Sequence, residues 1–350
     1  MRIRFLTSTP LDVSRGSGTY VGISVLAHAL GELGHEIAVE TPRVHLPVYT
    51  SERLLFNRML KRAPGFDLTV GFDMDGYRIA GAPGHIASLK GVIADEVRFE
   101  RGLTRLTMGM QARCERLHVF RASRVLVTSH YCARQVRELY GLPTEPEIVP
   151  ELIDLTHWRR LLAHGSAGPG PFTVLYVGRL YRRKRIDVLL RATAMLRARV
   201  PEMRVRIVGD GPCAAGLRRL TRELKLEGTI AWLGDVSRSR LVEEYNGATV
   251  FCLPSVQEGF GIVLLEAMAA GKPIVASRAA AIPEVAPHAT LVGPDDPEAL
   301  AGGLEVVYNS TDLRAAQASE GIAWVEQFDA PKVARRFLAA VGAGTTCSSA

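Results

Sequence analysis

The sequence predicts an α/β protein built from two doubly wound parallel sheets. The chain has 350 residues, which is enough for two domains with a core each. Short apolar runs alternate with helical patterns along most of its length, as in parallel sheets joined by helices. A stretch rich in Gly and Pro, residues 163–171, separates one alternation from a second. We therefore expect one domain at residues 1–165, another at 166–329, and a last helix at 330–345.

The composition is that of an ordinary globular protein, with 47% apolar and 23% charged residues. No run of eighteen uncharged apolar residues occurs, so no membrane-spanning helix is predicted. The first six residues lack the apolar core of a signal peptide and read as a strand, so we expect a cytoplasmic location. The five cysteines occur singly and the nine histidines show no H-x-x-x-H spacing, which argues against a disulfide framework and a zinc site.

The formal net charge of +7 is compatible with nucleic acid, an anionic membrane or phosphorylated ligands. Nucleic-acid binding favours basic residues interleaved with stacking aromatics, but aromatics make up only 7% of this chain. We expect no nucleic-acid partner. Two basic segments, residues 51–62 and 97–123, are interpreted as surface helices, and the alternative for both is peripheral contact with the inner face of a membrane.

Polar residues follow two predicted strands of the first half. A strand at 3–7 runs into Gly16-Ser17-Gly18 and then a helical pattern, an order that predicts a phosphate-facing turn. A later strand at 85–89 is followed by a polar segment that contains Lys90 and Asp95. Ligands of α/β domains bind at such strand ends, so Lys90 and Asp95 are candidate ligand-binding residues of the first domain.

Four apolar strands in the second half, near residues 172–177, 203–208, 229–233 and 249–253, end in glycine or in loops. The first three are followed by Gly178, Gly209 and Gly234. Because the carboxyl ends of parallel strands meet at one edge of a sheet, this repetition predicts a ligand along that edge.

The loop after the fourth strand carries two carboxylates. Glu258 lies beside Gly259 and Gly261, and Glu266 follows on an apolar helix, where it is costly to bury without a hydrogen-bonding partner. One interpretation is a capped helix with a solvated Glu. The other is a polar ligand at the sheet edge, with the carboxylates accepting from its hydroxyls and helix N-terminal amides facing an anion.

The segment E-G-F-G-I-V-L-L-E, from Glu258 to Glu266, resembles the E-x7-E motif of the retaining glycosyltransferases of family 4. Gly178-Arg179 and Lys184 are similar to that family's G-R-L-x-x-x-K-G, with Arg185 in place of the last glycine. The resemblance is densest from 172 to 292. It implies the GT-B fold, in which two Rossmann-like domains face across a cleft and the last helix crosses back to the first domain.

The resemblance also implies roles for individual residues. The family's Arg and Lys bind the donor diphosphate, its first Glu and the following amides contact the sugar and phosphates, and its second Glu binds the ribose. The implied catalytic residues are Glu258, Arg179 and Lys184. The implied donor-binding residues are Gly16, Gly18, Gly178, Arg179, Lys184, Gly209, Gly234, Glu258, Gly259, Phe260, Gly261 and Glu266.

Lys90 and Asp95 are the acceptor-side candidates, and there the chain departs from the pattern, because Lys90 stands where many members have a His.

The expected reaction is transfer of a sugar from a nucleoside diphosphate sugar to a hydroxyl of a glycan, lipid or small molecule, with retention. We expect neither metal nor bound cofactor, since two fixed cations can neutralise the leaving diphosphate. The alternatives are a nucleotide-sugar epimerase and a non-catalytic nucleotide-sugar-binding protein. A dehydrogenase is disfavoured, since no G-x-G-x-x-G follows a strand.

Overall fold

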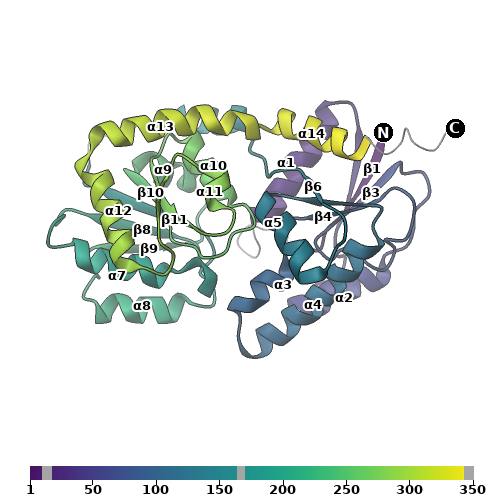
Figure 1. Cartoon of the computed structure of the whole chain (residues 1–350), viewed down its shortest axis with the longest axis horizontal. Helices are drawn as coiled ribbons and strands as arrows, with labels where there is room; N and C mark the ends of the chain where they lie inside the picture. The colour runs from purple at the N-terminus through teal and green to yellow at the C-terminus, as the bar shows by residue number, and fades with distance from the viewer. Residues whose placement is uncertain (10–17, 164–169, 343–350) are drawn as a thin grey trace. The chain divides into compact units, whose positions relative to one another are not determined.

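The computed structural model describes residues 1–9, 18–163 and 170–342, which divide between two compact units (Figure 1). Unit 1 comprises Met1–Leu152 together with Ala330–Ala350, and unit 2 comprises Ile153–Asp329. Unit 2 thus begins before the boundary expected at residue 165, since α6 (Leu155–Ala163) packs on helices of that unit. Most of the predicted linker at 163–171 lies outside the described residues.

Within the described residues, unit 1 holds a parallel six-stranded sheet in the order β2-β1-β3-β4-β5-β6. Its strands are β1 Arg2–Leu6, β2 Glu36–Glu40, β3 Leu68–Phe72, β4 His85–Leu89, β5 Arg124–Val127 and β6 Glu147–Ile148. Its helices are α1 Gly18–Glu32, α2 Tyr49–Met59, α3 Ile93–Glu96, η1 Val97–Phe99, α4 Gly102–Arg121, α5 His130–Gln135, η2 Val136–Tyr140 and α14 Ala330–Gly342.

The described part of unit 2 likewise holds a parallel six-stranded sheet, in the order β12-β11-β10-β7-β8-β9. Its strands are β7 Thr173–Val177, β8 Arg204–Val208, β9 Ile230–Gly234, β10 Val250–Leu253, β11 Ile274–Ser277 and β12 Thr290–Val292. Besides α6, its helices are η3 Arg182–Lys184, α7 Ile186–Leu196, α8 Ala214–Glu223, α9 Arg238–Gly247, α10 Ile262–Ala269, α11 Ile282–Val285, α12 Pro297–Asn309, α13 Thr311–Val325 and η4 Glu326–Phe328.

The two sheets confirm the predicted α/β, doubly wound architecture. In each sheet the chain starts in the middle, adds strands on one side, and then reverses to the other side. The reversal lies between β1 and β3 in unit 1 and between β7 and β10 in unit 2. The loops after two such strands diverge to opposite faces of the sheet and leave a crevice, which is where open α/β sheets bind ligands.

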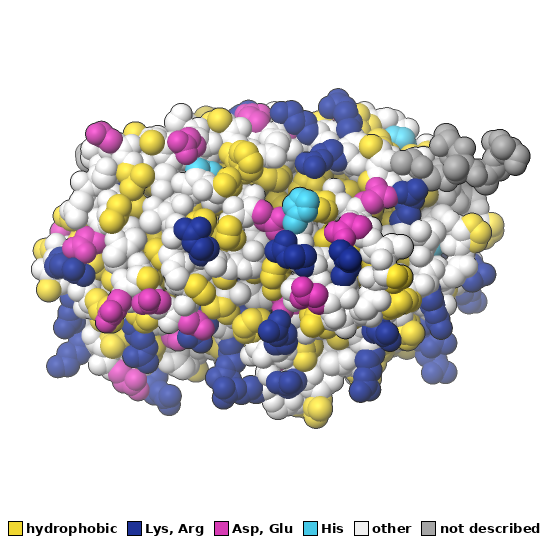
Figure 2. Space-filling model, in the orientation of Figure 1, with side chains coloured by type: hydrophobic (Ala, Val, Ile, Leu, Met, Phe, Trp, Pro, Cys, Tyr) yellow, Lys and Arg dark blue, Asp and Glu magenta, His cyan; other side chains and the backbone are white. Residues whose placement is uncertain are grey.

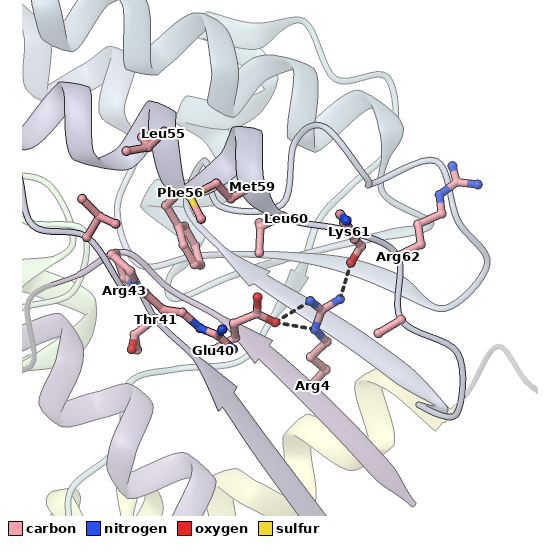
Figure 3. Close-up of a pocket in the computed structure, with 13 residues that line it drawn as sticks. Arg4, Glu40, Thr41, Arg43, Leu55, Phe56, Met59, Leu60, Lys61 and Arg62 are labelled. Carbon is pink, nitrogen blue, oxygen red and sulfur yellow. Dashed lines mark hydrogen bonds and ion pairs between the residues drawn. The ribbon is translucent and has the colours of Figure 1, made fainter.

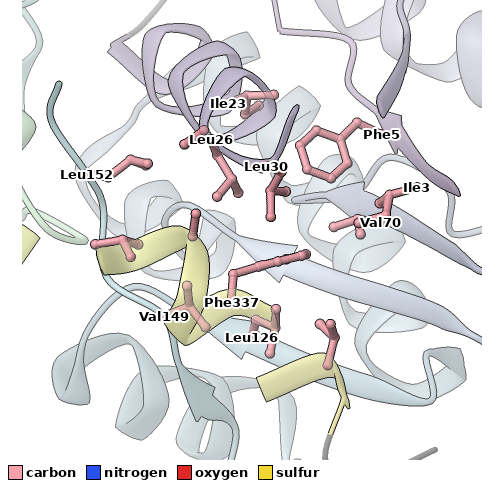
Figure 4. Close-up of a cluster of buried hydrophobic side chains, with 14 of the residues drawn as sticks. Ile3, Phe5, Ile23, Leu26, Leu30, Val70, Leu126, Val149, Leu152 and Phe337 are labelled. Atoms are coloured by element: carbon pink, nitrogen blue, oxygen red, sulfur yellow. The ribbon is translucent and has the colours of Figure 1, made fainter. Parts of the chain in front are cut away.

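The core of unit 1 includes residues from both ends of the chain. Phe5 of β1 packs edge to face on Phe72 of β3, with ring centroids 5.1 Å apart, and on Phe337 of α14 at 6.3 Å. Figure 4 shows Phe337 within this buried cluster, and Figure 1 shows α14 beside α1. The last described helix is therefore part of the first unit's core.

One long helix expected over residues 97–123 is interrupted. The chain forms α3 and η1, extends at Glu100 and Arg101, and begins α4 only at Gly102. Gly102 has a φ of +56°, which a glycine adopts at no steric cost. The glycine thus permits the break, and α4 carries only the later part of the arginine-rich segment.

Backbone hydrogen bonds join the loops at the carboxyl ends of neighbouring strands in unit 2. Gly209 N donates to Gly234 O at 2.7 Å, and Gly178 N donates to Val208 O at 3.0 Å. Gly209 has a φ of +116°, and a Cβ there would lie 2.2 Å from the carbonyl oxygen of Gly178. Only glycine therefore allows the β7 and β8 loops to approach this closely.

We predict that Gly209→Ala lowers the free energy of unfolding by about 2–4 kcal/mol, because the methyl group meets backbone in a left-handed conformation. The matched control is Gly216→Ala in α8, where a Cβ meets no atom within 4 Å. That change should stabilise by about 0.5–1 kcal/mol, since Ala is the better helix former. Urea unfolding measures both, and equal midpoints for the two variants would contradict the close approach.

Candidate functional site

The loops after β7 and β10 meet at the switch point of unit 2. Lys184, in the loop after β7, donates from Nζ to Oε1 of Glu258 at 2.6 Å, and Glu258 lies in the loop after β10. Both side chains are largely buried, with 14% and 8% of their areas exposed. A second bond, from Val256 N to Arg183 O at 2.9 Å, fixes the same two loops. The structure thus brings together two of the predicted catalytic residues.

Arg179 lies on the same loop but has a different carboxylate partner. Its Nη1 is 3.7 Å from Oδ2 of Asp235, which follows β9, and its side chain is 27% exposed. Its guanidinium lies 6.0 Å from the ring centroid of Tyr181. Arg179 and Lys184 are thus each paired with a carboxylate from another strand-end loop. An anion that binds here has to displace those carboxylates or bind the two cations beside them.

Glu266 is buried on α10 and has the partners that the sequence required. Tyr245 donates its hydroxyl to Oε2 at 2.9 Å, and Arg238 lies 3.8 Å from Oε1. Burial raises the pKa of Glu266, while Arg238 and the Tyr245 hydrogen bond oppose that shift. Both partners come from α9, which sequence reasoning did not connect with this site.

The segment between the two glutamates presents backbone rather than side chains. Gly261 has a φ of +94° and caps α10, whose first amides have no partner within the helix. The ring of Phe260 points into the core, where it packs edge to face on Phe328 at 5.5 Å. Only the backbone of Phe260 is therefore placed to serve a ligand at this edge.

The other predicted donor-binding glycines lie in different parts of the chain. Gly178, Gly209 and Gly234 lie at the carboxyl ends of β7, β8 and β9, all with positive φ. Gly18 is the first residue of α1. Gly16 lies outside the described residues.

The carboxyl edge of the unit 1 sheet holds a buried polar network. Asp75 accepts from Ser8 N and Oγ at 2.6 and 2.7 Å and from Asn57 Nδ2 at 2.8 Å. Arg53 donates from Nε to Ser8 Oγ at 2.9 Å and from Nη1 to Gln111 at 2.9 Å. Burying this many polar groups is tolerated because nearly every one has a partner.

One guanidinium nitrogen of Arg53 is buried in this network but incompletely bonded. Its Nη2 has no hydrogen-bond partner among the described residues and lies 3.5 Å from Asp75 and 4.0 Å from Asp73. Asp73 follows β3 in the left-handed region, with a φ of +53°. Burial raises the pKa of Asp73 to about 6, against the opposing effect of Arg53. An incompletely bonded guanidinium and a strained, titratable aspartate are typical of a ligand-binding edge.

Lys90, the residue at the position usual for His, forms a buried ion pair. Its Nζ donates to Oε2 of Glu151 at 3.0 Å, with 6% and 3% of the two side chains exposed. Its backbone N donates to Asp73 at 2.9 Å, so the pair adjoins the network. Each of these two buried charges is therefore neutralised by the other.

Asp95 is also buried and already bonded. It accepts from the hydroxyl of Tyr131 at 2.5 Å and from Nη1 of Arg98 at 3.2 Å. These contacts hold α3 against α5. Asp95 thus has an evident structural task in the described structure, whereas Asp73 lies closer to Lys90 and is the stronger acceptor-side candidate.

Two buried histidines lie beneath this edge. Burial lowers the pKa of His85 to about 3 and that of His118 to about 4, so both are neutral at pH 7. Their Nε2 atoms are 2.8 Å apart, and His118 Nδ1 is 2.6 Å from the carbonyl oxygen of Asp73. His118 therefore donates from Nδ1 and accepts at Nε2 from His85. This bond supports the left-handed backbone of Asp73.

A cavity of about 260 Å³ lies elsewhere in unit 1, beside the edge strand β2 (Figure 3). Phe56, Met59 and Leu60 form its apolar wall, and Arg4 donates to Glu40 and to the carbonyl of Lys61. It contains none of the predicted site residues. The described residues include no group of three metal-ligating side chains. No helix in the described part of the chain is both long and apolar enough to span a bilayer.

Sequence reasoning missed Asp73, Arg53, Asp235, Arg238 and Tyr245. Asp73 and Asp235 directly follow β3 and β9, so their position at strand ends is a signal that the sequence contains. Arg53 lay in a segment interpreted as a surface helix, and its burial in α2 reverses that interpretation. Nothing in the spacing of Arg238 or Tyr245 points to Glu266.

The strand order makes unit 2 a doubly wound domain, with charged loops at the switch point where such domains bind ligands. Residues 163–324 match the family described as Glycosyl transferases group 1. The match spans the part of the chain in which the sequence motifs resemble a glycosyltransferase family.

Curated relatives carry one recurring name. D-inositol 3-phosphate glycosyltransferase of Nocardia farcinica is 37% identical over 177 residues, covering 47% of this chain and 39% of that protein. The protein of the same name from Mycolicibacterium gilvum is 32% identical over 240 residues, covering 63% and 53%. The chain therefore aligns with only about two-fifths to half of the length of these relatives.

Solved structures match nearly the whole chain. Sucrose-phosphate synthase from Thermosynechococcus elongatus superimposes with a TM-score of 0.77 at 21% identity, covering 96% of this chain and 97% of that one. The glycosyltransferase WaaG gives 0.75 at 19% identity, covering 99% and 100%, and Anabaena HepE, solved with UDP and glucose, gives 0.72 at 18%, covering 98% and 100%. These similarities confirm the predicted GT-B fold.

We predict that Lys90→Met lowers the free energy of unfolding by about 3–5 kcal/mol, because it leaves the Glu151 carboxylate buried without a counter-charge. Lys90→Met combined with Glu151→Leu should recover most of that loss. The control is the exposed pair Arg219–Glu223, whose Arg219→Met variant should cost no more than about 0.5 kcal/mol. Urea unfolding of the double-mutant cycle measures this, and additive effects would contradict the coupling.

Proposed function

We propose that this chain is a retaining glycosyltransferase that moves a sugar from a nucleoside diphosphate sugar to an acceptor hydroxyl. The observation that carries the proposal is the Lys184–Glu258 pair at the switch point of a group 1 glycosyltransferase domain. The names of the curated relatives support glycosyl transfer, and the UDP-glucose bound in a HepE structure supports a nucleotide-sugar donor.

The donor would lie along the carboxyl edge of unit 2. Lys184 and Arg179 bind the diphosphate, and the amides at the start of α10 add fixed dipoles. Glu258, once Lys184 turns to phosphate, accepts from hydroxyls of the sugar. Glu266, oriented by Tyr245, accepts from the ribose hydroxyls. Each of these contacts is a hydrogen bond to a charged group, the strong class in proteins.

The two cations supply the main chemical assistance. As the glycosidic bond breaks, negative charge grows on the leaving diphosphate, and positive groups placed there stabilise the transition state more than the ground state. Arg179 and Lys184 can do this without a divalent ion. We infer departure and attack on one face of the sugar, with the leaving phosphate taking the acceptor proton, because Glu258 is committed to the sugar hydroxyls.

The acceptor would bind at the carboxyl edge of unit 1, beside Asp73. The Asp73 carboxylate, whose side chain is 16% exposed, offers an acceptor to a hydroxyl group, and the buried Arg53 guanidinium lies behind it at 4.0 Å. Among the described residues of this edge, Lys90 and Arg53 already face Glu151 and the two aspartates, so their charges are largely balanced. This balance favours a hydroxyl-bearing acceptor over one recognised by a phosphate at these residues.

We predict that Lys184→Ala lowers the kcat/KM for donor turnover by about 10²–10³, because it removes one of two charges on the leaving group. The control is Arg182→Ala, an exposed residue of the same loop, which should stay within about twofold. A screen of nucleotide sugars by thermal shift first identifies the donor, and release of nucleoside diphosphate reports turnover.

A Glu258→Ala variant separates the remaining alternatives on the same donor. A transferase loses turnover while retaining measurable donor binding. A non-catalytic binding protein shows no turnover even in the wild type, and an epimerase converts the donor without any acceptor. Full turnover by the variant would refute the role given to Glu258.

We predict that acceptor-dependent turnover falls as the pH drops through about 6, because Asp73 gains a proton and can no longer accept from the acceptor hydroxyl. The carboxyl is ionised above that pH, so activity is highest on the neutral side. Asp73→Asn should lower activity and flatten this limb. Asp67→Asn, which changes an exposed aspartate of unit 1, should leave the limb in place. A rate profile from pH 5 to 8 tests this. If Asp73→Asn shows the same fall in turnover near pH 6 as the wild type, the titrating group is not Asp73.

A further inference from the structure

Helix α4 is apolar on two faces. The buried face carries Ala112, Cys114 and Val119 and packs into unit 1. The opposite face carries exposed apolar side chains at steps of three, four or seven residues, which places them in one stripe along the helix. We name this set the α4 stripe: Leu103 (76% exposed), Leu106 (73%), Met110 (42%), Leu117 (42%) and Phe120 (45%).

The exposure of the first two members is exceptional for a folded protein. Leu103 and Leu106 lie in the first turns of α4, where every residue from 101 to 106 is exposed. Single exposed leucines are ordinary, but a row of five large apolar side chains in water marks an interaction surface. From Leu103 to Phe120 the stripe runs about 25 Å, at 1.5 Å per residue.

The exposed charges on α4, and that of Arg101 directly before it, are all positive. The exposed arginines that flank or interrupt it are Arg101, Arg105, Arg113, Arg116 and Arg121. The one acidic residue between positions 101 and 123 is Glu115, which is buried and bonded to Tyr140. Figure 2 shows Lys and Arg side chains gathered, with hydrophobic ones among them, where Figure 1 labels α4 and α2.

We propose that the α4 stripe is a docking surface for an anionic lipid bilayer, with the leucines inserted at the level of the headgroups and the arginines on the lipid phosphates. An outward face with leucines and phenylalanine bordered by arginines is the pattern of helices that lie in a membrane interface. A second copy of the chain fits less well, because a two-fold contact through the stripe sets arginines against arginines.

The experiment uses the full chain and vesicles of phosphatidylcholine, with and without phosphatidylglycerol, in a flotation assay. The wild type should float with the anionic vesicles, remain free with the neutral ones, and lose binding as salt screens the arginines. Leu103→Ser combined with Leu106→Ser should weaken vesicle binding about tenfold. Arg101→Gln combined with Arg105→Gln should reduce the preference for anionic lipid.

A matched control changes apolar residues of similar kind in unit 2. Val306→Ser combined with Ile322→Ser, at positions 53% and 44% exposed on α12 and α13, should leave vesicle binding unchanged. Circular dichroism and melting temperature report folding, and donor binding by thermal shift should be equal in all variants. The proposal does not depend on the donor chemistry, so loss of donor binding would count against the proposed function alone.

Three outcomes overturn the docking surface. The wild type could fail to float with anionic vesicles, or the Leu103/Leu106 variant could float as well as the wild type. The wild type could also form a dimer, by size exclusion, that the same double variant abolishes, and this would assign the stripe to a second copy of the chain.

Discussion

The fold of unit 2 depends on the way its strand-end loops are fastened to one another. Backbone hydrogen bonds join the β7 loop to the β8 loop, the β8 loop to the β9 strand end, and the β7 loop to the β10 loop. The approach of the β7 and β8 loops requires glycine at position 209, where a Cβ would meet the carbonyl of Gly178. The Lys184–Glu258 pair lies on this rigid backbone, so its geometry is set by main-chain contacts rather than by two long side chains alone.

In unit 1, side chains take part in the hydrogen bonds that join the loops at the switch point. Its switch point lies between β1 and β3, and there Ser8 and Asp75 make the bonds that backbone amides make in unit 2. Buried side-chain networks are costly when one member is lost, and they fix a unique arrangement when all are satisfied. A chemically specific edge of this kind suits recognition that differs from protein to protein, whereas a backbone edge suits a ligand part that stays the same.

The sequence was sufficient for the architecture because apolar strands and glycine endings repeat with regular spacing. The strand positions and the doubly wound sheets follow from that regularity, whereas the GT-B fold and the roles of Arg179, Lys184 and Glu258 were implied by the family resemblance. It was insufficient for partners that come from separate elements. Tyr245 reaches Glu266 across 21 positions, and Lys90 reaches Glu151 across 61, and no local pattern encodes such pairings. The inward direction of Arg53 was likewise decided by the network around it, against the polarity of its own helix.

The packing of α14 on α1 bears on how the chain comes to fold as it is synthesised. The cluster around Phe5 is closed by Phe337, yet the whole of unit 2 lies between them in the sequence. Strands β1 to β6 therefore leave the ribosome long before the helix that covers them, while unit 2 can complete its own sheet without waiting. Unit 2 is thus able to reach its native core before unit 1, which stays open on one side until α14 emerges.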